Sequence, residues 1–359
     1  MPFLVYFLYI CMCVSLDIKE AFAISCKNEQ NQDIDWFILY KLPRLEESPH
    51  GSKYAYLTSS DPNSWKLSSI SITDENSMLG KTWKDLKRNE NAATYLFYND
   101  EPPKGFSGSA VGHLKGIVAF DENTGFWMMH TVPKFGVISK YEYPNSGLKY
   151  GQYAFCVTYG TSQLNKISEH LLYCNPDIYL YKTSESVVRQ LTENSRTLFS
   201  EKPAFIHSSP FLKISTLQSI GNLEIKSFAK DNQLHQDLSS DIIAPTLKTS
   251  LISETWQNGA GHALPASCQG KTHVLDAKSI KVNTIDKMGE TQSFPFSSSD
   301  DHSKWAVSIE TDDDWICFAD LNRMESQEKR GGGALCFQSR SVWKQFHDAV
   351  ADTDMCPDA

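Results

Sequence analysis

The amino-acid sequence predicts a mixed α/β fold, and three observations support this prediction. Short apolar segments with the length and boundaries of β-strands occur in both halves of the chain. Helical segments follow strands in each half. The composition is that of an ordinary globular protein, with 41% hydrophobic, 21% charged and 12% aromatic residues. The 359 residues are enough for one large domain or for two smaller ones that share an interface.

The first residues predict the compartment. Residues 1–16 are almost wholly apolar, and a small-residue site, Ala21-Phe22-Ala23, follows. This pattern is typical of a signal peptide cleaved before Ile24, although its start lacks the usual positive charge. An N-terminal membrane anchor is the alternative, but the run is short and polar residues follow at once. No later stretch is long enough to span a bilayer, so we expect no stable membrane association.

The cysteines agree with a secretory protein. Nine are present, and seven remain after the predicted signal peptide is removed. None of the seven forms a C-x-x-C pair, which argues against a zinc site or a redox motif. In a secretory compartment disulfides are expected, and an odd number leaves at least one thiol free or paired with another chain.

In the first half, the pattern predicts five strands and two helices. The strands are expected at residues 35–42, 94–98, 113–121, 125–130 and 154–159, with 113–121 and 125–130 forming a hairpin. The helices are expected at residues 165–172 and 185–198.

Polar sequence near residues 180–183 is the best place to divide the chain, into halves 24–180 and 181–359. The second half shows the same pattern of short apolar strands with a helical segment. Strands are expected near residues 223–229, 302–309 and 315–319, and a closing helix at about 341–351.

Two H-x-K motifs carry the chemistry that the sequence predicts. His113-x-Lys115 and His302-x-Lys304 each stand at the start of an apolar strand, where alternation places both side chains on one face. An imidazole beside an ammonium suits phosphodiester cleavage without a metal. The imidazole attacks phosphorus or protonates the leaving oxygen, and the lysine neutralises the phosphate. One H-x-K is common by chance, whereas two copies in similar contexts favour a function.

Other candidates are weaker. The run Arg330-Gly331-Gly332-Gly333 has backbone amides that suit a phosphate, but a simple turn is the plainer interpretation. Asp312-Asp313-Asp314 has the carboxylates of a divalent-metal site, but a solvated loop is favoured. His130 is by default a surface or core histidine, and no cysteine-enzyme signature surrounds Cys174. The sequence has no H-E-x-x-H, P-loop or G-x-S-x-G motif.

The net charge of −9 at pH 7 is awkward for a protein that binds nucleic acid, because phosphate contacts supply most of the affinity. Ten histidines change this balance in acid, since their unperturbed pKa is about 6.5. The composition therefore suits a protein that works in acid.

Several motifs, in order along nearly the whole mature chain, resemble the deoxyribonuclease II family. In the first half they are Asp35-Trp36-Phe37, Tyr40-Lys41-Leu42-Pro43, Tyr98-Asn99-Asp100-Glu101-Pro102-Pro103, Gly112-His113-Leu114-Lys115-Gly116, Gly125-Phe126-Trp127, His130-Thr131-Val132-Pro133 and Tyr150-Gly151-Gln152. In the second half they are Ser227-Phe228-Ala229-Lys230, Asp301-His302-Ser303-Lys304-Trp305, Asp320-Leu321-Asn322-Arg323 and Arg330-Gly331-Gly332-Gly333-Ala334-Leu335-Cys336.

This resemblance implies a phospholipase D-like pseudodimer, in which two α/β halves with mixed sheets place the active site at their junction. It implies an acid endonuclease that cuts double-stranded DNA without a metal or other cofactor and leaves 3′-phosphate and 5′-hydroxyl ends. It also implies a lysosomal or secreted location. The oligomeric state stays open.

The resemblance assigns roles to this chain's residues. His113 and Lys115 form one half-site, and His302 and Lys304 form the other. His113 is the expected nucleophile, which forms a phosphohistidine, and His302 the general acid, although the two roles are open to exchange. His130 and Asn322 are expected near the phosphate. The implied disulfides are Cys26–Cys156, Cys268–Cys356 and Cys317–Cys336, with Cys174 left over.

Three departures from the family stand out. Phospholipase D motifs have an acid five residues after the lysine, where this chain has Phe120 and Ile309, so a carboxylate partner for either histidine is in doubt. No N-x-[ST] sequon occurs, which favours secretion over mannose-phosphate sorting to lysosomes. The region 234–250 is more polar than expected, which leaves its contacts open.

Three other functions remain open. The first is a catalytically inactive homologue that binds DNA or a host partner, but all four motif residues are present. The second is a phosphodiesterase acting on a lipid or small nucleotide. The third is a two-metal nuclease built on Asp312-Asp313-Asp314, which a chelator would inactivate.

Overall fold

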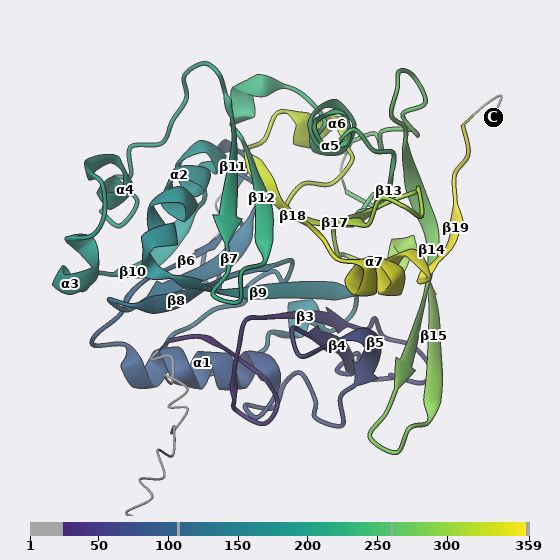
Figure 1. Cartoon of the computed structure of the whole chain (residues 1–359), viewed down its shortest axis with the longest axis horizontal. Coiled ribbons are helices and arrows are strands. Elements are labelled where there is room, and N and C mark those ends of the chain that lie inside the picture. Colours follow the sequence, from purple (N-terminus) through teal and green to yellow (C-terminus); the bar gives the residue numbers. More distant parts are fainter. Residues whose placement is uncertain (1–23, 106–107, 260, 357–359) are drawn as a thin grey trace, which may run out of the picture.

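The computed structural model describes residues 24–105, 108–259 and 261–356, so the predicted signal peptide at residues 1–23 lies outside the described residues. As the sequence predicts, the fold is α/β with mixed sheets and few helices (Figure 1). The elements up to residue 182 are β1 (Cys26–Lys27), β2 (Asp33–Ile34), β3 (Trp36–Lys41), β4 (Tyr54–Thr58), β5 (Asp61–Leu67), α1 (Met78–Asn89), β6 (Thr94–Asn99), β7 (Lys115–Phe120), β8 (Thr124–His130), β9 (Gln152–Gly160), α2 (Leu164–Cys174) and β10 (Ile178–Lys182). Those that follow are α3 (Glu185–Val188), α4 (Glu193–Thr197), β11 (Leu212–Gln218), β12 (Glu224–Lys230), α5 (Ala244–Leu247), β13 (Leu251–Glu254), β14 (Val274–Ile285), β15 (Thr291–Ser297), β16 (Trp305–Ser308), β17 (Trp315–Ala319), α6 (Glu325–Glu328), β18 (Gly332–Gln338), α7 (Arg340–His347) and β19 (Val350–Thr353).

The first series of strands runs in the order β10-β6-β7-β8-β9-β3-β4-β5, with every neighbouring pair antiparallel. Its central strands are mostly apolar because both faces are covered; all six residues of β3 are buried. Helix α1 covers one face with Trp83 and Leu86, which pack on alternate residues of the strands such as Phe97 and Ile117 (Figure 1).

The second series of strands runs in the order β11-β12-β18-β17-β16-β13, again antiparallel throughout. The long strand β14 then connects the two series. Near its start it pairs in parallel with β13, and at its end it pairs in parallel with β5. The two series are therefore hydrogen-bonded into one continuous system of strands.

The main core lies between the two series. The Phe155 ring of β9 lies 4.7 Å from that of Phe318 on β17 and 5.5 Å from that of Phe337 on β18, measured between centroids. Helix α2 contributes Ile167 and Leu171 to the same core and contacts β11, β12 and β18. The burial of this apolar surface is the main force that holds the two series of strands together.

Two helix predictions need correction. The helix expected at residues 185–198 is two short helices, because Thr192 caps α4: its hydroxyl accepts the Ser195 N–H, and its own N–H donates to the Asn165 side chain at 2.8 Å. The closing helix ends at His347, and the chain then forms β19, which pairs with β14. The expected boundary between halves falls inside β10, which pairs with β6, so the division of the chain stays a prediction.

The three disulfides implied by the resemblance are confirmed: Cys26–Cys156, Cys268–Cys356 and Cys317–Cys336. Among the described residues, Cys174 at the end of α2 is the one free cysteine, and it is buried. Such bonds are typical of proteins that fold in an oxidising compartment.

Candidate active site

The two H-x-K motifs meet in space. A small pocket is lined by His113, Lys115, Lys304, His130, Leu114, Thr131 and Asp320. His302 is not among these lining residues but contacts one of them, because its ring donates from Nδ1 to the carbonyl of Thr131 at 3.1 Å. The structure therefore brings all four motif residues to one place, although they come from distant parts of the chain.

The motif histidines precede their strands, which corrects the expectation that they begin them. Strand β7 starts at Lys115 and β16 at Trp305. Each histidine is held by the other part of the chain instead: the His113 N–H donates to the Gly331 carbonyl at 2.8 Å, and the His302 N–H donates to the Gly151 carbonyl at 2.9 Å. These two bonds, here called the crossed backbone bonds, fix each histidine against the opposite series of strands.

The glycines around His113 are required by close packing. A Cβ atom on Gly112 would lie 2.1 Å from the Cys174 carbonyl oxygen, and one on Gly331 would lie 2.3 Å from the same atom. The turn expected at residues 330–333 is wrong, because Gly332 already begins β18. The small residues here allow the end of α2 to approach both segments.

Asp100 is the carboxylate partner of His113. It follows β6 directly, and its Oδ2 lies 2.6 Å from His113 Nδ1 while its Oδ1 accepts from Lys115. Burial alone raises the pKa of Asp100, but His113 and Lys115 hold it well below its usual range. The doubt over carboxylate support is thus resolved for His113, although the acid comes from the neighbouring strand rather than from the motif's own.

The two ring nitrogens of His113 have different environments. Its Nδ1–H donates to Asp100, so Nε2 carries the lone pair, and Nε2 is buried without a hydrogen-bond partner among the described residues. Burial lowers the pKa of His113 to about 3, against the effect of Asp100. The ring is therefore neutral in the empty site.

Arg330 holds this half of the site in place through hydrogen bonds. Its guanidinium donates to the carbonyls of Val111, at 2.9 Å, and Gly112, at 3.0 Å. It also donates to Asp100 Oδ2 at 3.2 Å. The arginine thus fixes the residues just before His113 together with the carboxylate that orients it.

The surroundings of His302 differ. Its Nδ1 faces the Thr131 carbonyl and, at 3.3 Å, Gln152 Oε1, so neutral oxygens take the place of a carboxylate. The Trp256 ring packs edge-on at 5.4 Å between centroids. Burial, with Lys304 and Lys115 next, lowers the pKa of His302 well below its usual value. Burial and Lys115 also lower the pKa of Lys304 to about 7.

The two residues expected near the phosphate have different positions. His130, at the end of β8, lines the pocket; its Nδ1 accepts from the Val132 N–H at 3.2 Å, and its ring packs on Phe135. Asn322 is buried but is not among the residues that line the pocket, and its Oδ1 has no partner among the described residues.

Asp320 is a pocket residue to which the sequence analysis assigned no role, although it stands in one of the family motifs. It follows β17, is 5% exposed, and accepts the Gly333 N–H on Oδ2 at 2.9 Å. Burial raises its pKa to about 7, against the effects of Gly333 and Lys304. Asp100 and Asp320 share one position in the fold: each directly follows a strand that pairs with a strand carrying or adjoining an H-x-K motif.

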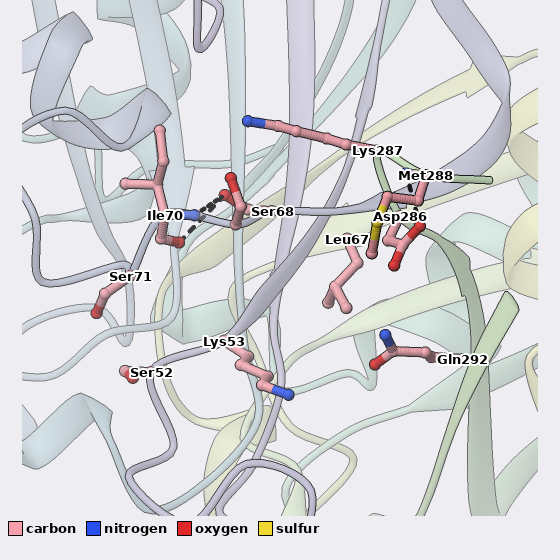
Figure 2. A pocket seen from close by; sticks show the side chains of 11 residues that line it. Ser52, Lys53, Leu67, Ser68, Ile70, Ser71, Asp286, Lys287, Met288 and Gln292 are labelled. Atoms are coloured by element: carbon pink, nitrogen blue, oxygen red, sulfur yellow. Dashed lines mark hydrogen bonds between the residues drawn. The ribbon is translucent and has the colours of Figure 1, made fainter. Parts of the chain in front are cut away.

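A larger hollow lies elsewhere on the surface (Figure 2). Its lining includes Lys53, Ser68, Lys287, Met288 and Gln292, and Figure 2 shows Ser68 hydrogen-bonded to Ile70. No histidine lines it, so its size does not make it the reactive site. Within the described residues, no cluster of three or more His, Cys, Asp or Glu side chains has the arrangement of a metal site. No helix in that part of the chain is both long and apolar enough to cross a bilayer.

Comparison with known proteins places this site in a family. The sequence profile of the Deoxyribonuclease II family matches residues 25–356. Deoxyribonuclease-2-beta of Mus musculus is 36% identical over 341 residues, 93% of each chain. Cell-death-related nuclease 7 of Caenorhabditis elegans is 32% identical over 339 residues, 93% of this chain and 88% of the relative. Plancitoxin-1 of Acanthaster planci is 32% identical over 363 residues, 98% of this chain and 97% of the relative. The chain therefore belongs to the deoxyribonuclease II family.

Proposed function

We propose that this protein is an acid endodeoxyribonuclease that hydrolyses double-stranded DNA without a metal and leaves 3′-phosphate and 5′-hydroxyl ends. The observation that carries the proposal is the meeting of two imidazoles and two ammonium groups around one small pocket. The names of its relatives, several of which are deoxyribonucleases, support DNA as the substrate.

In the first step, Nε2 of His113 attacks the phosphorus of a phosphodiester. An N–P bond forms and the bond from phosphorus to the 5′-oxygen breaks, while His302 gives its proton to that oxygen. The product held on the enzyme is a phosphohistidine that carries the 3′ side of the DNA. Asp100 supports this role because its carboxylate stabilises the positive charge that develops on the His113 ring.

In the second step, His302 takes a proton from water, and the water oxygen attacks phosphorus. The N–P bond breaks and releases the 3′-phosphate, with His113 neutral again. Lys115 and Lys304 neutralise the non-bridging oxygens in both steps. His130 and Asn322 assist in holding the phosphate: His130 lines the pocket, and the side-chain NH2 group of Asn322 is the part of that amide able to donate to a phosphate oxygen.

Acid favours this chemistry through charge. Because the pKa of Lys304 is lowered to about 7, this lysine is charged at pH 5 and neutral well above pH 7. His302 needs a proton before the first step, and an anionic phosphodiester in the pocket raises its pKa by attraction. Both effects strengthen substrate binding and catalysis as the pH falls.

We further propose that the site lies at the junction of two phospholipase D-like halves, 24–180 and 181–359. The order β6-β7-β8-β9-β3 has a counterpart in β13-β16-β17-β18-β12, and the histidine of each H-x-K motif precedes the second strand of its five-strand order. The crossed backbone bonds are equivalent under the same correspondence.

We place the protein in the secretory pathway, as a lysosomal or secreted enzyme. The three disulfides and family membership support this, and the sequence of residues 1–23 has the pattern of a signal peptide.

The test is cleavage of a supercoiled plasmid by the purified mature protein at about pH 5 with EDTA. We expect nicking and linearisation, with 3′ ends that block a polymerase until phosphatase treatment. His113→Asn and His302→Asn should each lose at least about a thousandfold in rate, because neither a nucleophile nor a proton donor is replaced. His235→Asn is the matched control: this exposed histidine has a positive φ of 51°, which asparagine tolerates.

Other outcomes would overturn the proposal. Substantial activity in either site variant would exclude the two-histidine mechanism. An absence of cleavage with EDTA, together with cleavage when magnesium is added, would assign the chemistry to carboxylates. DNA binding without cleavage in either condition would identify a catalytically inactive homologue.

A further inference from the structure

Two residues occupy equivalent positions at the ends of β8 and β17, and they bind the backbone in the same way. Thr131 donates its N–H to the Tyr153 carbonyl and accepts the Tyr153 N–H on its hydroxyl at 3.0 Å. Asp320 donates its N–H to the Gly333 carbonyl and accepts the Gly333 N–H on its carboxyl at 2.9 Å. Both side chains line the pocket. The fold thus places a neutral hydroxyl in one half and a carboxyl in the other.

The two side chains differ in the hydrogen-bonding capacity that they have left. The single donor of the Thr131 hydroxyl is already engaged, because it donates to Gln152 Oε1 at 2.6 Å. Among the described residues, the only hydrogen bond to the Asp320 carboxyl is the one from Gly333 to Oδ2. Its other oxygen, Oδ1, is therefore free to meet a substrate in the pocket.

Several charged and titratable side chains lie close to Asp320. Lys304 and Lys115 attract the carboxylate, while Asp100 repels it. Tyr98 and Tyr153, both buried and with pKa values raised well above normal, are neutral neighbours whose ionisation Asp320 opposes. Cys174 lies near enough for the same effect on its thiol.

The remaining pocket groups that titrate are the histidines. Burial lowers the pKa of His113 and of His130 to about 3, so both rings are neutral in the empty site. An ionised Asp320 would thus neutralise the charge of one lysine. It would also repel an incoming phosphate, because both groups would be negatively charged in a buried site.

We propose that Asp320 contacts the scissile phosphate as a neutral carboxylic acid, donating a hydrogen bond from Oδ1 to a non-bridging oxygen, and that its ionisation ends activity as the pH rises. This assignment rests on the function proposed above and adds a substrate-contacting residue to it. Burial, which raises the pKa of Asp320 to about 7, keeps the proton on this group at pH 5. A protonated carboxyl in a water-poor pocket is a strong donor to a developing negative charge.

The experiment compares the pH–rate profiles of the full-length mature wild type and Asp320→Asn, measured as kcat/KM on a labelled DNA duplex with EDTA. Asparagine is neutral at every pH, retains an oxygen for the Gly333 N–H, and supplies an N–H donor for the phosphate. We expect the ratio of its rates at pH 8 and pH 5 to exceed the wild-type ratio about tenfold, because only about a tenth of a carboxyl with a pKa of about 7 keeps its proton at pH 8.

Asp320→Leu and Asp35→Asn are the companion variants. Leucine keeps the volume but neither hydrogen bond, so we expect a loss of about a hundredfold at pH 5, typical of removing one donor from an anion site. Asp35 is a carboxyl whose pKa burial also raises, but it binds Ser219 and Gly221 away from the pocket, so Asp35→Asn should keep the wild-type profile. Thermal unfolding checks that each variant folds, and Asp320→Thr, which copies Thr131, replaces any that does not.

An alkaline limb that Asp320→Asn leaves unmoved would overturn the proposal, as would wild-type activity in Asp320→Leu at pH 5. If the wild type itself is inactive with EDTA at pH 5, the proposed function and this assignment both fail. An active wild type with inactive His113→Asn and His302→Asn, combined with an unmoved limb in Asp320→Asn, would reject this assignment alone.

Discussion

At the scale of single residues, the site depends on groups that stand outside the motifs. His113 and Lys115 share one carboxylate, and Arg330 binds that carboxylate from the opposite part of the chain. The motif supplies the atoms that we propose to react, whereas Asp100 sets which ring nitrogen of His113 carries the proton. Orientation and charge at the reactive atom are therefore set by a positioning residue.

Replacing Asp100 by asparagine tests this. The amide still reaches His113 but no longer stabilises positive charge on the ring, and its NH2 group favours the wrong tautomer. We expect kcat to fall about a hundredfold or more with little change in KM, measured on duplex DNA at pH 5.

Glu101→Gln is the control for that variant. Glu101 is 39% exposed and lies 3.7 Å from Lys115, so screening by water makes its contribution small. A comparable loss of kcat in Glu101→Gln would show that the negative charge near Lys115, rather than the bond to His113, is what matters.

The sequence alone predicted four candidate reactive residues that the structure brings together, but it did not predict their partners. The H-x-K motifs are local, and their spacing is visible in a single chain. Asp100 and Asp320 reach the pocket only through strand pairing, since Asn99 lies opposite Lys115 and Ala319 lies opposite Ala334. Strand register depends on tertiary packing, which one sequence without relatives does not specify.

At the scale of elements, strands were predicted better than helix ends. Central strands such as β3, β8 and β9 are long apolar runs with clear stops, because both of their faces are buried. The segment at residues 185–198 has helical periodicity, but the cap at Thr192 overrides it with a local hydrogen bond. Strand β14 is half-exposed and polar, so its pattern did not stand out, although it joins the two series.

The start of β18 offers a test at this scale. In Gly331→Ala the new Cβ would lie 2.3 Å from the Cys174 carbonyl, so either the end of α2 or the residue holding His113 has to move. We expect a loss of about 1–3 kcal/mol in the free energy of unfolding and a fall in kcat larger than that loss explains at a temperature where the variant is folded.

Gly160→Ala is the matched substitution. Gly160 has a φ of −70°, and the nearest atom to a new Cβ is 3.8 Å away, so alanine fits. Urea unfolding and cleavage assays on both variants check the expectation; equal behaviour of the two alanines would mean that the close approach at Gly331 has no consequence.

At the scale of the whole molecule, a buried histidine makes the stability of the fold depend on pH. His170 is buried, donates or accepts through Nδ1 with Ser227, and has a pKa that burial lowers to about 3. The unfolded chain binds this proton with a pKa near 6.5, so between those values the unfolded state holds more protons than the folded state. The contribution of this histidine to stability is therefore full above pH 6.5 and is lost as the pH falls.

His170→Gln should remove that part of the pH dependence. Its stability relative to wild type should improve by about 2–3 kcal/mol on going from pH 7 to pH 4.5, from the two pKa values above. Urea unfolding at both values of pH measures this difference. An identical pH dependence in variant and wild type would mean that His170 does not contribute to the acid sensitivity of the fold.

The crossed backbone bonds have a consequence for biosynthesis. A growing chain presents His113 long before Gly331, whose carbonyl holds this histidine, has been made. A product that stops between residues 305 and 330 would contain all four motif residues and still lack the backbone partner of His113. The arrangement around His113 therefore forms only after Gly331 has been added, so the presence of both motifs is not enough to complete the site.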